Sequence, residues 1–212
     1  MRHPSGLIKA LASACLPLEW CRGSMPTGIK KRIEYLYYLK FEEAPVSRIE
    51  EIGNLISKLE NSDRNTRKQA RMELVEAGPE ATPLLVAALK NRNSIIRHEA
   101  AKTFLGLHDP AAAPALVEAL LDESIEVHWA ASEALIALGR DAILPVLKGI
   151  TTHFDSYRFR QGAYHVLHTL KRTSQLDVHS AKVLESLGDI QASASAPWAA
   201  EKAIEALEIF KK

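Results

Sequence analysis

Two pairs of residues in this chain have types and spacings suited to metal binding. His98 and Glu99 are adjacent, and an imidazole together with a carboxylate suits non-haem iron. His165 and His168 are three residues apart, which on a helix places both imidazoles on one face, one turn apart. No third ligand accompanies the histidine pair, so we predict that no metal is bound there.

The sequence contains no other arrangement typical of catalysis. It has no glycine-rich phosphate loop, no paired general acid and base, and no nucleophile motif. We therefore assign no catalytic residue and expect no cofactor. We predict a non-enzymatic protein and keep an enzyme as the alternative.

A repeat determines which elements carry these residues. Pro83, Pro114 and Pro145 follow one another at intervals of 31 residues, and each opens an apolar run that is followed by a second one. A fixed period of this length indicates stacked units, none of which can bury its apolar face alone. No segment shows sustained alternation of apolar and polar residues, so we predict an all-α fold with no sheet.

The pattern divides the chain into four regions. These are a poorly ordered tail or upstream extension, an N-terminal capping helix, about four repeats and a divergent C-terminal capping repeat, over residues 1–24, 25–46, 47–172 and 173–212. The last repeat is expected to diverge because a terminal repeat must present one solvated face. Within it, the small polar residues 191–196 predict a loop, followed by a helix over 198–210 with Pro197 in its first turn.

The composition limits the possible partners. The net charge is +1 at pH 7, so no overall field favours nucleic acid or an anionic membrane. The two cysteines, Cys15 and Cys21, form no disulfide framework and fit a reducing cytosol. No apolar stretch approaches the roughly 20 residues that a bilayer span needs. We predict a cytoplasmic protein without a membrane, nucleic acid or small molecule as partner.

The second run of each unit carries the residues of a family resemblance. Its idealised pattern is V-R-x-x-A-x-x-A-L-x-x-L-G, with the best copy in residues 127–139. With a preceding Pro-x-Leu helix and Asn61, Asn91 or Asp122 in the turn, this pattern resembles the HEAT repeat, and more narrowly the short bacterial variety named after the phycobilisome lyases. The resemblance covers roughly residues 50–172 and implies a right-handed α-α superhelix. It is unspecific for function, since HEAT arrays host many unrelated roles.

The spacing within the second helices supports the same fold. Four alanines share one register position, where a small side chain lets two helices approach closely: Ala70, Ala100, Ala131 and Ala163. Four larger apolar residues share another position and are expected to form a continuous spine: Leu74, Phe104, Leu135 and Leu167.

The resemblance implies that the second helices line a concave face. Their register positions three, six, seven and ten are expected to project away from the spine. Trp129 and Tyr164 form a candidate hot spot for protein binding, because Trp and Tyr are enriched at such sites. The alternative is that both residues pack against the next repeat. The predicted protein-binding ridge consists of Lys68, Arg71, His98, Lys102, Trp129, Glu133, Gln161, Tyr164, His165 and His168.

Other functions stay open as alternatives. Residues 96–101 are similar to a motif of deoxyhypusine hydroxylase, a HEAT-type enzyme that holds two irons with four His-Glu pairs. The equivalents of His98-Glu99 in the other repeats cannot complete such a site, so we interpret this pair as a solvated helix face: they are Lys68-Gln69, Trp129-Ala130 and Gln161-Gly162. Phycobilin lyase activity is implied only at the level of the repeats. A nucleic-acid role would need a continuous basic stripe, which acidic residues interrupt from Glu99 onward.

Basic residues recur at register position two of the second helices: Arg67, Arg97, His128 and Arg160. They could form a ladder for phosphate, or they could bond to the turn residues and backbone groups between repeats. We predict the second arrangement. The sequence therefore predicts a bacterial HEAT-like scaffold that binds an unknown protein partner.

Overall fold

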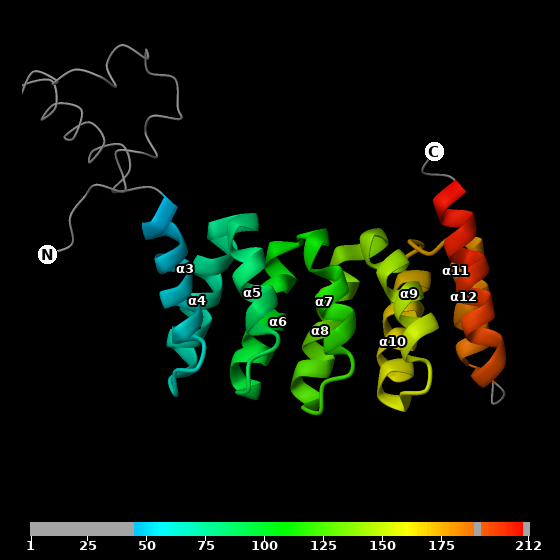
Figure 1. Cartoon of the computed structure of the whole chain (residues 1–212), viewed down its shortest axis with the longest axis horizontal. Coiled ribbons are helices and arrows are strands. Elements are labelled where there is room, and N and C mark those ends of the chain that lie inside the picture. The colour runs from blue at the N-terminus through cyan, green and yellow to red at the C-terminus, as the bar shows by residue number, and fades with distance from the viewer. Residues whose placement is uncertain (1–44, 189–191, 210–212) are drawn as a thin grey trace, which may run out of the picture. The chain divides into compact units, whose positions relative to one another are not determined.

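The structure, a computed structural model, describes residues 45–188 and 192–209. The expected tail, residues 1–24, and nearly all of the expected capping helix, residues 25–46, lie outside the described residues. Residues 50–212 form one compact unit. Within the described residues every regular element is a helix (Figure 1), which confirms the predicted all-α fold.

Pairs of helices follow one another with the predicted period. In chain order, the α-helices and the short 3-10 helices (η) are α3 (Pro45–Lys58), α4 (Arg64–Ala77), η3 (Gly78–Ala81), α5 (Thr82–Ala88), α6 (Ser94–Leu107), η4 (Pro110–Ala112), α7 (Ala113–Ala119), α8 (Ile125–Leu138), η5 (Gly139–Ala142), α9 (Ile143–His153), α10 (Tyr157–Arg172), α11 (Val178–Leu187) and α12 (Ala192–Ile209). Among the described helices, none combines the length and apolar content needed to cross a bilayer.

Local capping residues set where the second helices begin and end. The side chains of Asp63 and Asn93 accept hydrogen bonds from backbone N–H groups in the first turns of α4 and α6. Gly78 and Gly139 end α4 and α8 with φ angles of 71° and 63°, which glycine adopts without a Cβ clash. His108 ends α6 in the left-handed helical conformation, with a φ of 52°.

The helices of residues 50–188 lie in two layers, which Figure 1 shows as a row of pairs. The second helices pack side by side, α4 on α6, α6 on α8 and α8 on α10. Each first helix packs against the second helix of its own repeat, as α5 on α6, α7 on α8 and α9 on α10. A side chain at a given register position therefore has equivalents on the neighbouring second helices.

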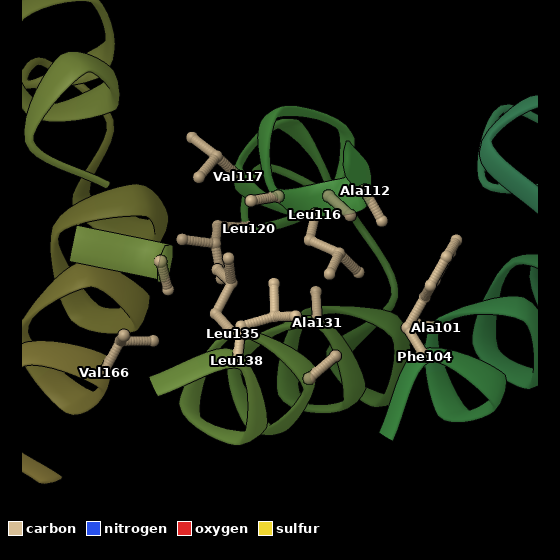
Figure 2. Close-up of a cluster of buried hydrophobic side chains, with 14 of the residues drawn as sticks. Ala101, Phe104, Ala112, Leu116, Val117, Leu120, Ala131, Leu135, Leu138 and Val166 are labelled. Carbon is tan, nitrogen blue, oxygen red and sulfur yellow. The ribbon is translucent and has the colours of Figure 1, made fainter. Parts of the chain in front are cut away.

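The predicted apolar spine is confirmed. Leu74, Phe104, Leu135 and Leu167 are each at most 1% exposed, and the four alanines that share their own register position are equally buried. In Figure 2, side chains of α7 and α8 meet between the two helices, with Phe104 of α6 at one side and Val166 of α10 at the other. The core is thus continuous from repeat to repeat, as stacking of incomplete units requires.

The last helical pair is reversed relative to the repeats before it. α11 comes first in the chain but packs on the second helix α10, whereas α12 packs on the first helix α9. Ion pairs span both contacts: Lys171 Nζ lies 3.5 Å from Glu185 Oε1, and Lys148 Nζ lies 3.7 Å from Glu208 Oε1. A 3-10 helix follows each of α4, α6 and α8 and leads into the next first helix, whereas none follows α10.

The loop expected over residues 191–196 is wrong from Ala192 onward. α12 already begins at Ala192, and Pro197 lies inside the helix. Ala196 and Ala200 are fully buried on one face of α12, which packs against α9 and α11. Packing of these small residues therefore extends the helix ahead of the proline, against the local preference of the sequence.

Candidate functional site

Trp129 of α8 and Tyr164 of α10 are large side chains that stay exposed on neighbouring second helices. Their exposed fractions are 39% and 41%. The Trp129 ring meets the His165 ring edge-on, with centroids 5.0 Å apart, and the Tyr164 ring stacks on the His168 ring at 5.7 Å. We name these four side chains the aromatic patch.

Polar and ring contacts between two repeats hold the aromatic patch. His165 Nε2 lies 3.1 Å from Glu133 Oε1. Glu133 is one helical turn along α8 from Trp129. Trp129 therefore packs on the next repeat, as one of the two interpretations expected, and still leaves over a third of its surface open. Next to Tyr164 and His168, at the boundary between α10 and α11, the surface is hollowed by about 520 Å³.

The exposed strip of the second helices, formed by register positions three and seven, is narrower than the predicted ridge. Register position six was expected to project outward, but Ala101 and Ser132 hold it in α6 and α8 and are fully buried. Each central second helix is packed on both sides, which covers this position. Only α10 presents it openly, as Tyr164, while Arg71 of α4 is mostly covered, with a side chain 18% exposed.

The other predicted residues of the ridge lie at the surface to different degrees. Exposed side chains are Lys68, Glu133, Gln161 and His168, and partly covered ones are His98, Lys102 and His165. Register positions three and seven thus remain accessible along α4, α6, α8 and α10, and the aromatic patch occupies the part of the strip formed by α8 and α10.

The interpretation of His98-Glu99 as a solvated helix face is wrong for Glu99, which is only 4% exposed. Its Oε1 accepts a hydrogen bond from Arg67 Nε at 3.0 Å, and its Oε2 pairs with Arg71 Nη1. Both arginines come from α4, so Glu99 joins the first repeat to the second. The sequence pattern could not reveal this role, because the equivalent residues in the other repeats are Gln69, Ala130 and Gly162.

The charges around Glu99 determine its ionisation. Burial raises the pKa of the Glu99 carboxyl, but the Arg67 hydrogen bond and the positive charges of Arg71 and Lys102 outweigh burial and hold the pKa below its ordinary value. Burial lowers the pKa of the His98 imidazole; Lys102 and Arg71 act in the same direction, and Glu99 opposes them. Glu99 is therefore a charged group at neutral pH.

The residues at register position two bond to the turns, as predicted. Arg67 Nη1 donates to the carbonyl oxygens of Asn61 and Ser62, at 2.7 and 3.1 Å. Arg97 Nη1 makes the same two bonds one repeat later, and Arg160 Nη1 donates to a turn carbonyl oxygen at 2.6 Å. In the third repeat the buried His128 ring bonds through Nδ1 to the Leu120 carbonyl oxygen at 2.9 Å. These groups tie each turn to its second helix and are not free to form a phosphate ladder.

Arg158 makes the two bonds to the turn that the short His128 side chain does not make. Its Nη1 donates to the carbonyl oxygens of Asp122 and Glu123, each at 2.7 Å, and these oxygens are the equivalents of those that Arg67 binds in the first repeat. Arg158 belongs to the next repeat and lies two positions before Arg160. This role was not predicted from the sequence, although the histidine among arginines at position two was a signal for it.

No group of three or more histidine, cysteine or acidic residues lies close enough to hold a metal ion within the described part of the chain. The glutamate next to His98 is engaged by the two arginines of α4, and His165 is paired with Glu133. Each of the two sequence pairs that suggested metal ligands therefore has another partner.

Comparison with known families identifies the repeats. Residues 52–136, from α3 to α8, match the family model of HEAT repeats. Residues 52–136 are therefore HEAT repeats. Among curated proteins, none matches the sequence significantly.

Solved structures show the same HEAT-type solenoid. A chain from the complex of CpcE and CpcF of phycocyanin lyase from Nostoc sp. PCC7120 superposes with a TM-score of 0.50 at 20% sequence identity. The match covers 73% of the present chain and 98% of that chain. This likeness confirms the all-α superhelix, and at this identity it shows the fold alone.

Proposed function

We propose that this HEAT-repeat protein binds a protein partner through the aromatic patch on α8 and α10. The observation that carries the proposal is the pair of exposed rings, Trp129 and Tyr164, each held by a histidine ring. Large aromatic side chains fixed before binding bury much apolar surface and lose little conformational freedom, which is why they dominate binding hot spots.

The arrangement of the array supports a protein as the partner. The patch lies on adjacent, rigid second helices, and its neighbouring hollow at the boundary of α10 and α11 offers room for a side chain. The structurally similar chain comes from a complex of two proteins, CpcE and CpcF. The proposed role is that of a non-enzymatic bacterial scaffold acting in the cytoplasm.

A double substitution, W129A with Y164A, tests the proposal. Affinity purification from the native host with the unaltered chain identifies the partners, and the variant is expected to lose them while its helicity and melting temperature stay unchanged. Loss of the partners is expected because two anchors of a hot spot typically contribute at least about 2 kcal/mol each.

The chain offers a matched control for this test. Trp198 and Tyr157 are also an exposed tryptophan and an exposed tyrosine, at 63% and 71%, and they lie outside the aromatic patch. W198A with Y157A is expected to retain the partners. If the patch variant still captures them, or if it unfolds so that the rings prove to be core residues, the proposal is wrong.

A further inference from the structure

Positive charge is in excess on the second helices that precede the aromatic patch. Arg67 and Arg71 of α4 share the single carboxylate of Glu99, so one of their two charges stays uncompensated within this group. Lys68 is exposed and forms no ion pair among the described residues. Lys102 of α6 lies near Glu99, which the two arginines already occupy. This face of α4 and α6 therefore presents a surplus of cations.

These cations are in line with the aromatic patch. Lys68, His98 and Trp129 hold register position three on α4, α6 and α8, which pack side by side. Lys102 and His165 hold position seven on α6 and α10, one turn further along their helices. One strip thus runs from a cationic part on α4 and α6 to an aromatic part on α8 and α10.

We infer that the partner docks an acidic segment carrying a large apolar side chain, with its carboxylates against Lys68 and Lys102 and its apolar side chain against Trp129. The inference rests on the proposed function and specifies the chemistry of the partner. Complementary charge along such a strip fixes the register of the segment and speeds its association. The apolar side chain of the segment then buries apolar surface against Trp129, which contributes binding free energy.

Acidic groups beside the patch favour a peptide over nucleic acid. Glu126 and Glu133 lie one turn to either side of Trp129 on α8 and are both exposed. A phosphate backbone carries charge at regular short intervals and would meet both carboxylates on passing the patch. A peptide can place its carboxylates at the cationic part alone and an apolar side chain at Trp129.

Selection from a displayed library of random peptides on the full-length chain tests the inference. The unaltered chain is expected to enrich peptides in which Asp or Glu residues lie within a few positions of an aromatic or aliphatic residue. Synthetic copies of these peptides are expected to bind the K68E/K102E variant about tenfold or more weakly at physiological salt, because two attractive contacts become repulsive. K68Q/K102Q serves as a second variant in case charge reversal disturbs the fold.

Two other exposed lysines provide the control. K90E/K182E changes the net charge by the same amount away from the strip and is expected to leave peptide affinity within about twofold, since distant surface charges are screened. The affinity of the same peptides for the W129A/Y164A variant is also measured.

The outcomes separate this inference from the proposed function. Peptides that need Trp129 and Tyr164 but show no acidic bias, or that tolerate K68E/K102E, overturn the inference and leave the proposed function standing. Peptides that ignore W129A/Y164A overturn the proposed function. If a single- or double-stranded oligonucleotide displaces the peptides and itself depends on Lys68 and Lys102, the occupant is nucleic acid and the inference is wrong.

Discussion

Neighbouring repeats are joined by buried ion pairs in the first half of the array and by close apolar packing in the second half. Between the first two repeats, Glu99 of α6 binds Arg67 and Arg71 of α4. Between the second and third repeats, Arg97 donates two hydrogen bonds to the Asp122 carboxylate, from Nε at 2.6 Å and from Nη2 at 2.8 Å. Both contacts use the planar guanidinium, which suits carboxylates geometrically.

The third and fourth repeats instead meet through a close contact at a glycine and through the hydrogen bonds of Arg158 to the turn. A Cβ atom on Gly149 of α9 would lie 2.6 Å from Val117 of α7 and from Phe159 of α10, so only a glycine leaves room for this contact. The ion pairs at this junction, His153 with Glu118 and His165 with Glu133, are at the surface. Sequence-equivalent helices therefore stack by different chemistry, and the junctions should respond differently to mutation and to pH.

The largest expected effect comes from breaking the ionic junction with E99A. Removal of the carboxylate leaves two mostly covered guanidinium groups without their shared partner, and we expect a loss of about 3 kcal/mol in the free energy of unfolding. Urea denaturation measures this loss in the free energy of unfolding. E133A, which removes an exposed carboxylate paired with His165, is the matched control and should cost less than about 1 kcal/mol. Equal losses for the two variants would contradict the contrast between the junctions.

Overpacking the glycine junction with G149A should cost about 2 kcal/mol, because the added methyl group meets a buried phenyl ring and a branched side chain. Thermal and urea unfolding measure the change. Gly53 of α3 has open space around its Cβ position, so G53A should instead stabilise the helix, by about 0.5–1 kcal/mol. If G149A were neutral, close packing would not be what joins these repeats.

The two junctions should also differ in their response to acid. Because the pKa of Glu99 is lowered in the folded state, its ionised form contributes stability above the ordinary glutamate pKa, and this contribution is lost as the pH falls through the lowered value. The stability difference between the unaltered chain and E99Q should therefore be largest at neutral pH and shrink in acid. The difference for G149A should not depend on pH. Unfolding curves recorded between about pH 7 and pH 3 measure both stability differences. A difference for E99Q that does not change with pH would contradict the stabilising role of the ionised Glu99.

The smallest effects are expected from the surface pairs of the glycine junction. E118Q and E133Q should each change the free energy of unfolding by less than about 0.5 kcal/mol, because exposed pairs gain little in water. The change should disappear in about 1 M salt, which screens exposed charges. A larger or salt-resistant loss would mean that these pairs act as buried ones do.

Much of the fold and part of the candidate site could be predicted from the residues alone. The apolar spine and the bonds from register position two to the turns recur in each repeat, so the repeat spacing reveals them in the sequence. Glu99 and Arg158 could not be predicted, because each acts in one repeat only and binds a group of the neighbouring repeat. The buried state of Ala101 also depends on packing from both sides.

The order of residues establishes the helices, their pairing into repeats and the face that each turns inward, because these follow from local spacing and capping. The tertiary structure alone decides how one repeat meets the next. It turns Glu99 from a solvated residue into a shared ion-pair partner, reverses the last pair of helices and brings Trp129 against His165. These contacts depend on the distance and angle between stacked helices, which all the side chains at the junction set together.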